Sequence, residues 1–307
     1  MRSRYFVLFI VLLVFIFSCN KRINSPDDLE IPDSLRIDIP RFGSDISFEV
    51  VSWNLQNFPR LGEQTIQDVA EIVYDLDADL FGLQEIEDTS SFRRLLSFLP
   101  DYEGIYSDDL YSGTEYQKTA VIFNKEMITI SGKKMLFSDD SYSFPRPPLQ
   151  VYIQAFHNQN WFDFTLIVLH LKASGGAENE ARRRSACEKL KNYLDLEITN
   201  SADQDYMVVG DWNDELSDPE VDNVFQTFLN DPLNYTFLTQ ILLNDPVVNA
   251  TYIGSFNSII DHILISEDLE NEFTNGYLQV IKADQFFSAY NHEVSDHRPV
   301  GVKFFVF

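Results

Sequence analysis

The sequence has few positive charges and few cysteines. Lys and Arg together number 23 against 48 Asp and Glu, so the formal net charge is −25 at pH 7. A chain this acidic repels polyanions at long range, although high charge also favours solubility. Because nonspecific nucleic-acid binding depends on cationic contacts, any such substrate has to meet a local basic patch, a bound metal ion or both. We find no low-complexity segment and no repeat of about 20–50 residues.

The first residues are typical of a secretion signal. Arg2 and Arg4 precede an apolar run from Tyr5 to Phe17, which is too short to span a bilayer comfortably. Cys19 follows Ser18 as in a bacterial lipobox, so residues 1–18 are predicted to be a signal peptide and Cys19 a lipidated N-terminus. The alternative is an ordinary signal peptide or a membrane anchor. Removing two arginines changes the charge from −25 to −27.

Three parts are therefore expected. After the signal peptide, residues 19–46 are a proline-containing tether, and residues 47–307 form the folded domain. The chain would be secreted across the inner membrane and anchored by lipid to a bacterial membrane, on the periplasmic side or the cell surface. With Cys19 lipidated, Cys187 has no intramolecular partner and is predicted to be a buried thiol.

The apolar patterning predicts a mixed α/β protein. Helices are expected over Gln64–Leu76, from Ser90 or Ser91 to Leu99, over Glu178–Ile198 and, less regularly, over about 219–243, while 101–117 reads as a loop. Strands are expected at Phe48–Trp53, Leu80–Gln84, Ala120–Phe123, Leu149–Phe156, Phe162–Leu171, Tyr206–Gly210, Ile259–Ile265, Tyr277–Lys282 and Val300–Phe307. The 45% hydrophobic content supports one large core or at most two domains. These elements favour a β-sandwich covered by helices.

Polar residues follow most of these strands. They are Asn54, Gln84-Glu85, His170, Gly210-Asp211-Trp212-Asn213 and Asp261-His262, and Ser295-Asp296-His297 precedes the last strand. A sheet fixes side chains at its strand ends, while the loops leave room for substrate. Carboxylates for a hard cation, orienting amides and two histidines together indicate a metal-dependent phosphoester hydrolase.

Several of these residues also have a purely structural interpretation. Glu85 is a Mg²⁺ ligand or a hydrogen-bonded strand cap, and Asn54 is common after strands. Asp211 and Asn213 face one side and orient water, or they form an Asx turn. Asp261 fixes the tautomer of His297, unless His297 is a satisfied core histidine.

The remaining histidines and the arginines carry weaker signals. We interpret His262 as structural because it faces away from Asp261 on a strand, and His157 and His292 belong to no motif. Arg182-Arg183-Arg184 is either a solvated helix face or a phosphate contact. Arg146, on a rigid loop between prolines, is a second candidate phosphate contact.

Taken in order, these motifs resemble the endonuclease/exonuclease/phosphatase superfamily, which includes deoxyribonuclease I. The matching stretches are Val51-Ser52-Trp53-Asn54, Leu83-Gln84-Glu85, Leu169-His170-Leu171-Lys172, Gly210-Asp211-Trp212-Asn213, Ile260-Asp261-His262-Ile263-Leu264 and Ser295-Asp296-His297-Arg298-Pro299-Val300. The resemblance implies a four-layer α/β/β/α sandwich with two mixed, mostly antiparallel sheets. It also implies Mg²⁺-dependent phosphoester cleavage by activated water, with Mn²⁺ or Ca²⁺ as alternatives.

The resemblance assigns roles as well. Glu85 would be the principal metal ligand, with Asn54 and Asp296 near a metal. Asp211 would orient or deprotonate water and Asn213 would position it, while His297 paired with Asp261 would act as a base or stabilise the transition state. His170 would contact phosphate or assist the leaving group.

One position departs from the family pattern. Several family nucleases carry a phosphate-contacting Tyr where this chain has Gln117-Lys118-Thr119, so Lys118 is a substitute candidate alongside Arg146 and Arg182. The first hypothesis is a secreted, lipid-anchored endonuclease or phosphodiesterase acting on nucleic acid as a monomer. The second is a phosphatase or phosphodiesterase of small or lipid phosphoesters. A catalytically inactive binding module is the third.

Overall fold

The structure, a computed structural model, describes residues 36–109, 117–200 and 204–307. The predicted signal peptide, Cys19 and most of the predicted tether lie outside the described residues. The described residues all belong to one packed unit. None of the described helices is long and apolar enough to cross a membrane.

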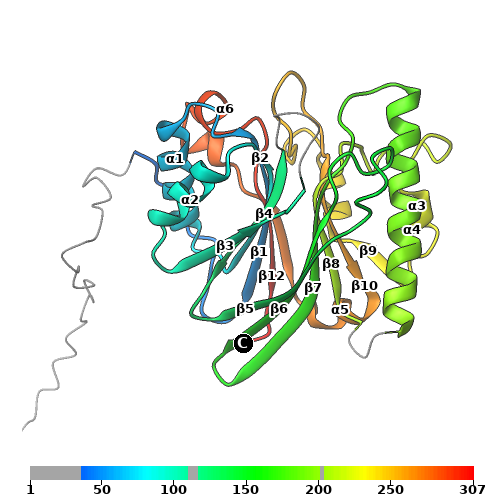
Figure 1. Ribbon diagram of the computed structural model, residues 1–307, viewed down its shortest axis with the longest axis horizontal. Helices are drawn as coiled ribbons and strands as arrows, with labels where there is room; N and C mark the ends of the chain where they lie inside the picture. The colour runs from blue at the N-terminus through cyan, green and yellow to red at the C-terminus, as the bar shows by residue number, and fades with distance from the viewer. Residues whose placement is uncertain (1–35, 110–116, 201–203) are drawn as a thin grey trace, which may run out of the picture. The chain divides into compact units, whose positions relative to one another are not determined.

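Two six-stranded sheets form the centre of the molecule (Figure 1). The first, in the order β11-β12-β1-β2-β4-β3, contains Tyr277–Val280, Val300–Phe304, Phe48–Phe58, Leu80–Ile86, Lys118–Asn124 and Tyr102–Tyr106. The second, in the order β5-β6-β7-β8-β10-β9, contains Ile128–Met135, Leu149–His157, Asn160–His170, Tyr206–Asp211, Asp261–Ser266 and Tyr235–Phe237. β1 pairs with β2 and β7 with β8 in parallel, and the other pairs are antiparallel.

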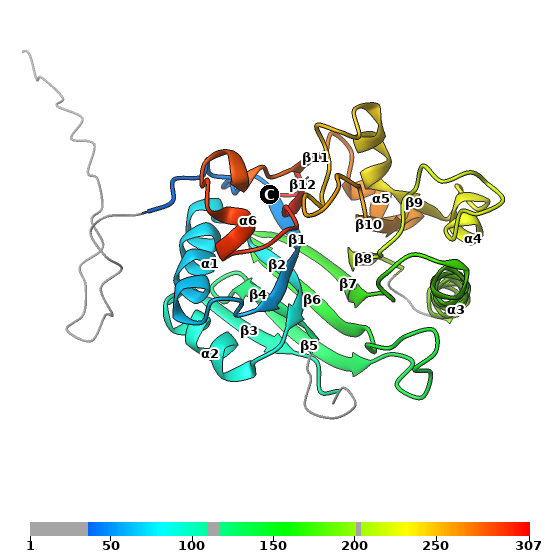
Figure 2. The same ribbon diagram turned by 90° about the horizontal axis from the view of Figure 1, so that it is seen from above.

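Helices cover the outer face of each sheet (Figure 2). α1 (Glu63–Leu76) and α2 (Thr89–Ser97) pack on the first sheet, and α3 (Ala177–Asn200) packs on the second. The shorter helices are α4 (Gln226–Leu229), η1 (Leu238–Asn244), α5 (Glu267–Glu272), η2 (Ala283–Gln285) and α6 (Tyr290–Glu293). The predicted four-layer α/β/β/α sandwich is thereby confirmed.

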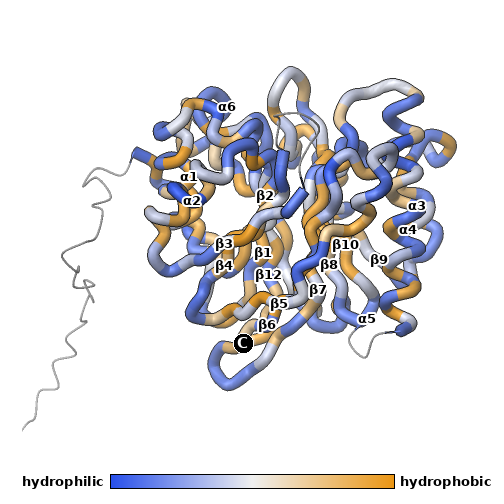
Figure 3. Tube along the Cα trace, viewed as in Figure 1, coloured by the Kyte–Doolittle hydropathy of each residue, from blue (hydrophilic) through white to orange (hydrophobic). Residues whose placement is uncertain are grey.

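The strands are apolar on both faces because each sheet packs against the other sheet on one face and against helices on the other. In β1, Phe48 and Val50 point between the sheets, whereas Val51 and Trp53 pack under α1. Figure 3 shows the hydrophobic positions running along the strands and the hydrophilic ones on the connecting loops. The two sheets pack tightly beside Gly82, where an added Cβ would lie 2.7 Å from Val209 Cγ2.

The structure corrects four expectations about secondary structure. The predicted loop 101–117 contains β3, and β5 was not predicted because its residues alternate weakly and five of them are exposed. α2 begins at Thr89 because Asp88 caps it, accepting from the backbone N–H of Ser90 and Ser91. The stretch expected to be helical over about 219–243 instead includes strand β9.

The C-terminal part of the predicted tether packs onto the domain. Ile37, Ile39 and Phe42 are buried in the core beneath α1. The backbone N–H groups of Phe42 and Gly43 both donate to Leu76 O at the end of that helix, at 3.0 and 2.8 Å. Residues 36–43 therefore form part of the folded unit.

Candidate active site

The alternation of side chains along the strands explains why the motif residues meet. Asn54 continues the face of β1 that carries Phe48 and Val50, and it therefore points between the sheets. His170 continues the corresponding face of β7, as Asp211 does on β8 and Asp261 on β10. β1, β2, β7 and β8 reach this end of the sandwich with their C-terminal ends, which brings the motif side chains together between the two sheets.

Glu85 departs from this rule. By alternation it would share the face of Phe81 and Leu83, which pack under the helices. Its backbone is left-handed, with φ of 63°, a conformation that is uncommon for a residue other than glycine. The resulting irregularity in the pairing of β2 with β4, between Leu83 and Ile86, accompanies a carboxylate that reaches the cluster. A strained backbone at such a position is typical of a functional site.

One half of the cluster is built around Asn54. Its Nδ2 donates to Glu85 Oε1 at 3.1 Å and to Asp211 Oδ2 at 3.0 Å. The Nε2 atom of His170 lies 3.7 Å from the same Glu85 oxygen and 3.6 Å from the same Asp211 oxygen. Asn57 N holds the other Glu85 oxygen at 2.9 Å. Two carboxylates, an amide and an imidazole thus face one another.

The other half is built around His297. Its Nδ1 lies 2.9 Å from Asp261 Oδ2, and its Nε2 lies 3.8 Å from Asp211 Oδ2 and 3.9 Å from Asp296 Oδ1. Ser295 holds this segment in place, since its Oγ donates to Asn54 O at 2.7 Å and accepts from His297 N at 3.0 Å. The predicted pairing of Asp261 with His297 is present in the structure.

Burial and neighbouring charges shift the pKa values of these groups in opposite directions. Burial opposes the charged form of His297, but Asp261 and Asp211 outweigh it and raise the pKa of His297 to about 10. Burial, together with repulsion from Asp261 and Glu85, raises the pKa of Asp211 to about 7 despite the opposing charge of His297. Burial lowers the pKa of His170 well below its usual value, and the nearby cation Arg146 adds to this shift. His297 is therefore held as a cation and His170 as a neutral imidazole.

The donor set suits a hard divalent cation. Glu85 and Asp211 bring two carboxylates next to Asn54, and the Asp296 carboxylate lies on the far side, 3.9 Å from His297 Nε2. Mg²⁺ prefers such oxygen ligands. With Asp261, four carboxylates share this region with one protonated imidazole. A bound cation would offset this excess negative charge and would lower the raised pKa of Asp211.

Two contributing residues were missed by the sequence analysis. Gln56 donates from Nε2 to Asp296 Oδ2 at 2.8 Å and accepts from Asp296 N at 3.0 Å, so it fixes a predicted metal-binding carboxylate. The centroid of the Tyr252 ring lies 5.1 Å from the centroid of the His297 ring. Gln56 lies two residues after Asn54, a spacing that was the available signal, although its left-handed backbone, with φ of 40°, could not be read from the sequence. Tyr252 precedes Asp261 in a loop and carried no comparable signal.

Asn213 and Arg146 lie at the edge of the cluster. Asn213 N donates to Asp211 Oδ1 at 2.9 Å, and its side chain donates to Leu171 O at 3.3 Å. The first contact forms the predicted Asx-type turn. The same turn places Asp211 and Asn213 side by side, as the water-orienting interpretation requires. Arg146 donates to the same Leu171 carbonyl at 3.1 Å and to Gln117 Oε1 at 2.8 Å. Asn213 and Arg146 therefore flank the segment that follows His170.

The other predicted phosphate contacts are engaged inside the protein. Lys118 is buried and donates to the carbonyls of Ser107 and Asp109. Arg182 donates to the carbonyls of Tyr142 and Ser141, at 2.7 and 3.0 Å. Neither side chain is part of the carboxylate–histidine cluster. Sequence patterning could not show this, because the carbonyls that hold them belong to other segments of the chain.

The rest of the arginine run is also structural. Arg183 pairs with Asp214 at 2.7 Å, with both side chains buried, and Arg184 donates to the carbonyls of Asn223 and Asp222. The run is therefore not a free basic face.

His262 lies on the opposite face of β10, as its position in the strand predicts. Its ring contacts Phe225 and Phe237, and its nitrogens are bonded to Thr239 Oγ1 and Asp214 O, both at 3.0 Å. Burial lowers its pKa to about 4. His262 is thus a neutral core residue outside the cluster.

The chain belongs to the endonuclease/exonuclease/phosphatase family, whose sequence model matches residues 51–297. Members of this class are phosphoester hydrolases, and the chain is accordingly a phosphoric ester hydrolase. A search of curated protein sequences finds no match.

Solved structures share the fold at low sequence identity. TDP2 of D. rerio, complexed with a single-strand DNA product, is 16% identical with a TM-score of 0.60, covering 85% of this chain and 99% of the other. The mannosyl-6-phosphatase of Bacteroides thetaiotaomicron is 17% identical with a TM-score of 0.61, covering 83% and 98%. The catalytic domain of human Nocturnin, with bound sulfate, is 20% identical with a TM-score of 0.59, covering 85% and 95%.

Proposed function

We propose that the protein is a Mg²⁺-dependent hydrolase of small or terminal phosphoesters. The observation that carries this proposal is the convergence of Glu85, Asn54 and Asp211 on one side of the site and the Asp261–His297 pair on the other. A divalent cation held by Glu85, Asn54 and Asp296 would neutralise charge on the substrate phosphoryl group and on the leaving oxygen. The choice among Mg²⁺, Mn²⁺ and Ca²⁺ rests on the oxygen-rich donor set, which suits Mg²⁺.

The protein side chains divide the remaining work. Asp211, turned toward the site and fixed by Asn54 and Asn213 N, accepts a proton from the attacking water. His297, oriented by Asp261, presents its Nε2–H to a phosphoryl oxygen and stabilises the charge that develops there. His170, neutral and buried beside Glu85 and Asp211, contacts the phosphoryl or leaving oxygen as a hydrogen-bond partner.

The charge distribution favours a small substrate over the interior of a long nucleic acid. The chain carries −25 overall, and Lys118, Arg182, Arg183 and Arg184 are all bonded to internal carbonyls or carboxylates. A nucleic-acid groove needs a track of cations that contacts successive phosphates. Arg146 and Lys172 also donate to backbone carbonyls, of Leu171 and Ala173. They differ from the other cations in lying close enough to the cluster to lower the pKa of His170, so they supply local positive charge for one or two phosphoryl groups.

An endonuclease remains the second candidate, because the TDP2 neighbour is bound to a single-strand DNA product. Salt dependence separates the two substrates, since nucleic-acid binding weakens steeply with ionic strength.

The test is hydrolysis of p-nitrophenyl phosphate, bis(p-nitrophenyl) phosphate and plasmid DNA, each with Mg²⁺ and with EDTA. We expect Mg²⁺-dependent turnover of a small ester that is lost in Asp211→Asn and His297→Ala. Asp268→Asn and His292→Ala, at exposed positions, are the matched controls and should retain activity. Plasmid nicking that exceeds small-ester turnover would establish the endonuclease instead. Hydrolysis that persists in EDTA or in both variants would refute the assigned site.

We also propose that residues 1–18 direct secretion, that Cys19 carries a lipid and that the hydrolase domain acts as a monomer on the periplasmic or outer surface of a bacterial membrane. The support is the sequence Ser18-Cys19 after the apolar run, together with Cys187, which is a buried free thiol. Metabolic labelling with a palmitate analogue should mark the full chain but not its Cys19→Ala variant. Equal labelling of both would refute the anchor.

A further inference from the structure

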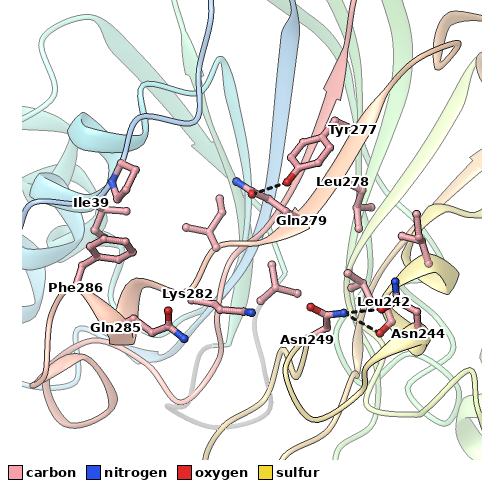
Figure 4. A pocket seen from close by; sticks show the side chains of 14 residues that line it. Ile39, Leu242, Asn244, Asn249, Tyr277, Leu278, Gln279, Lys282, Gln285 and Phe286 are labelled. Carbon is pink, nitrogen blue, oxygen red and sulfur yellow. Dashed lines mark hydrogen bonds between the residues drawn. The ribbon is translucent and has the colours of Figure 1, made fainter.

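A second cavity lies away from the catalytic cluster, at the β11 edge of the first sheet. It has a volume of about 480 Å³, within the range of small-molecule sites. Its walls come from β11, η2, the segment from η1 to Asn249 and the N-terminal residues Ile39 and Pro40 (Figure 4). The catalytic residues take no part in its lining.

The cavity is unusual for so acidic a protein. None of the described residues that line it is an Asp or Glu, whereas a pocket beside Asp231 and another beside Glu103 both contain acidic residues. Lys282 is the cation in its lining, and Figure 4 shows this side chain extending between Gln285 and Asn249. Within the described part of the chain, no carboxylate or carbonyl accepts a hydrogen bond from the Lys282 ammonium group. A single cation in an acid-free cavity provides a place for one negative charge on a ligand.

Amides surround this cation. Gln279, Gln285, Asn244 and Asn249 all line the cavity. Gln279 accepts from Tyr277 Oη at 3.0 Å, which leaves its NH₂ group available, and Asn249 uses its own NH₂ group on Leu242 O and Asn244 Oδ1, both at 3.1 Å. An amide both donates and accepts, as a hydroxyl group does. The amide NH₂ donors and oxygen acceptors therefore suit a ligand that carries several hydroxyl groups.

Two aromatic rings complete the cavity. Tyr277 and Phe286 line opposite sides of it (Figure 4), and both side chains are about half exposed, at 50% and 52%. Flat apolar surfaces beside amides are suited to a ring that is hydroxylated at its edge and apolar on its C–H face.

We propose that this cavity binds a sugar ring carrying one carboxylate, that is, a uronic acid or a uronate residue at the end of a glycan. The carboxylate pairs with Lys282, the hydroxyl groups bond to the amides, and the ring lies against Phe286. One cation matches the single charge of a carboxylate better than the double charge of a phosphate monoester. The site is independent of the proposed hydrolase activity.

The test measures binding of glucuronate by titration calorimetry and by saturation-transfer NMR on the chain in EDTA, with glucose and acetate as probes of the two halves of the recognition. EDTA prevents the carboxylate from binding through a metal at the catalytic cluster, and glucuronate contains no phosphoester bond. We expect saturable glucuronate binding, with glucose and acetate each at least about tenfold weaker. Glucose lacks the charge that pairs with Lys282, and acetate lacks the hydroxyl groups and the ring.

Lys282→Gln should weaken glucuronate binding at least about tenfold, because a hydrogen bond to a charged group contributes more than a neutral one. The matched control is Lys125→Gln, which removes the same charge at an exposed position in a pocket bordered by Glu103 and Glu126. It should leave the affinity unchanged. Phe286→Ala, at an exposed position, provides a second variant that tests the ring contact without disturbing the core.

The absence of saturable glucuronate binding would overturn the proposal, and so would equal affinity in the wild type and Lys282→Gln. Acetate binding as tightly as glucuronate would overturn the sugar assignment. Melting curves of each variant check that the fold is retained. Loss of phosphoester hydrolysis in another experiment would leave these outcomes unaffected, so the two proposals fail separately.

Discussion

Asp261 is expected to hold His297 in its charged form, and Asp261→Asn tests this directly. In the structure the carboxylate lies 2.9 Å from Nδ1, and the pKa of His297 is raised to about 10 against the penalty of burial. Asn retains an oxygen that can accept the same hydrogen bond, so the ring orientation is preserved while the charge is lost.

The magnitude follows from Coulomb's law. Two unit charges about 4 Å apart at an effective dielectric constant of about 20 interact by about 4 kcal/mol, which corresponds to about 3 pKa units. The pKa of His297 in Asp261→Asn should therefore fall from about 10 to about 7. Because the folded-state pKa exceeds the unfolded value, the pair stabilises the fold below pH 6.5 and this contribution is lost as the pH rises through about 10.

The assay is an NMR titration of the imidazole Cε1–H signals in the metal-free protein, with His297→Ala used to assign the resonance. Asp268→Asn, at an exposed position, is the matched control and should not change the titration. With Mg²⁺ and substrate, Asp261→Asn should also lower kcat by on the order of 10²-fold, because the charged donor that stabilises the developing phosphoryl charge is weakened. A His297 pKa that changes by less than about one unit, or that is already near 6.5 in the wild type, would refute the reasoning.

Three further predictions concern the metal, the pH dependence of stability and the core. Glu85→Gln should weaken Mg²⁺ binding in calorimetry at least about tenfold, whereas Glu126→Gln at an exposed position should not; equal affinities would exclude Glu85 as a ligand. Burial and repulsion from the neighbouring carboxylate of Glu49 raise the pKa of Asp79 to about 9. The folded state therefore keeps a proton that the unfolded chain loses above about pH 4. The free energy of unfolding falls as the pH rises from about 4 to about 9. Asp79→Asn should consequently raise the free energy of unfolding in urea at pH 8 by at least about 1 kcal/mol and change it little at pH 4.5, and equal effects at both pH values would contradict this. Leu190→Ala, in the buried face of α3, should cost about 2–5 kcal/mol in the same assay, against less than about 0.5 for Leu196→Ala on the exposed face of that helix; similar losses would mean that this helix does not carry the core.

The sequence alone determined the order of most elements and the identity of the residues at the strand ends. Nearly continuous apolar runs locate β1, β7 and β8, because a strand between two layers must be apolar on both faces. The two-residue period of a strand then places Asn54, His170 and Asp211 on one side of their strands. These properties are local and depend on the period of the strand, so the sequence alone predicts them.

Tertiary structure decided what those residues contact. Glu85 reaches the cluster only because its backbone adopts a left-handed conformation, against the alternation of its strand. Arg182 and Lys118 looked like phosphate contacts in the sequence, yet backbone carbonyls of other segments hold both. Strands such as β3 and β5 are stabilised by pairing with neighbours rather than by their own pattern.

The pairing of Asp261 with His297 and the acid-free cavity around Lys282 show the same limit. In the first case the sequence supplied both residues and the fold confirmed that they meet across 36 positions. In the second, residues from three separate segments form one cavity, and no local pattern marks it. Local periodicity determines which face a side chain takes, whereas the packing of distant segments determines which charges, amides and rings come to share one site.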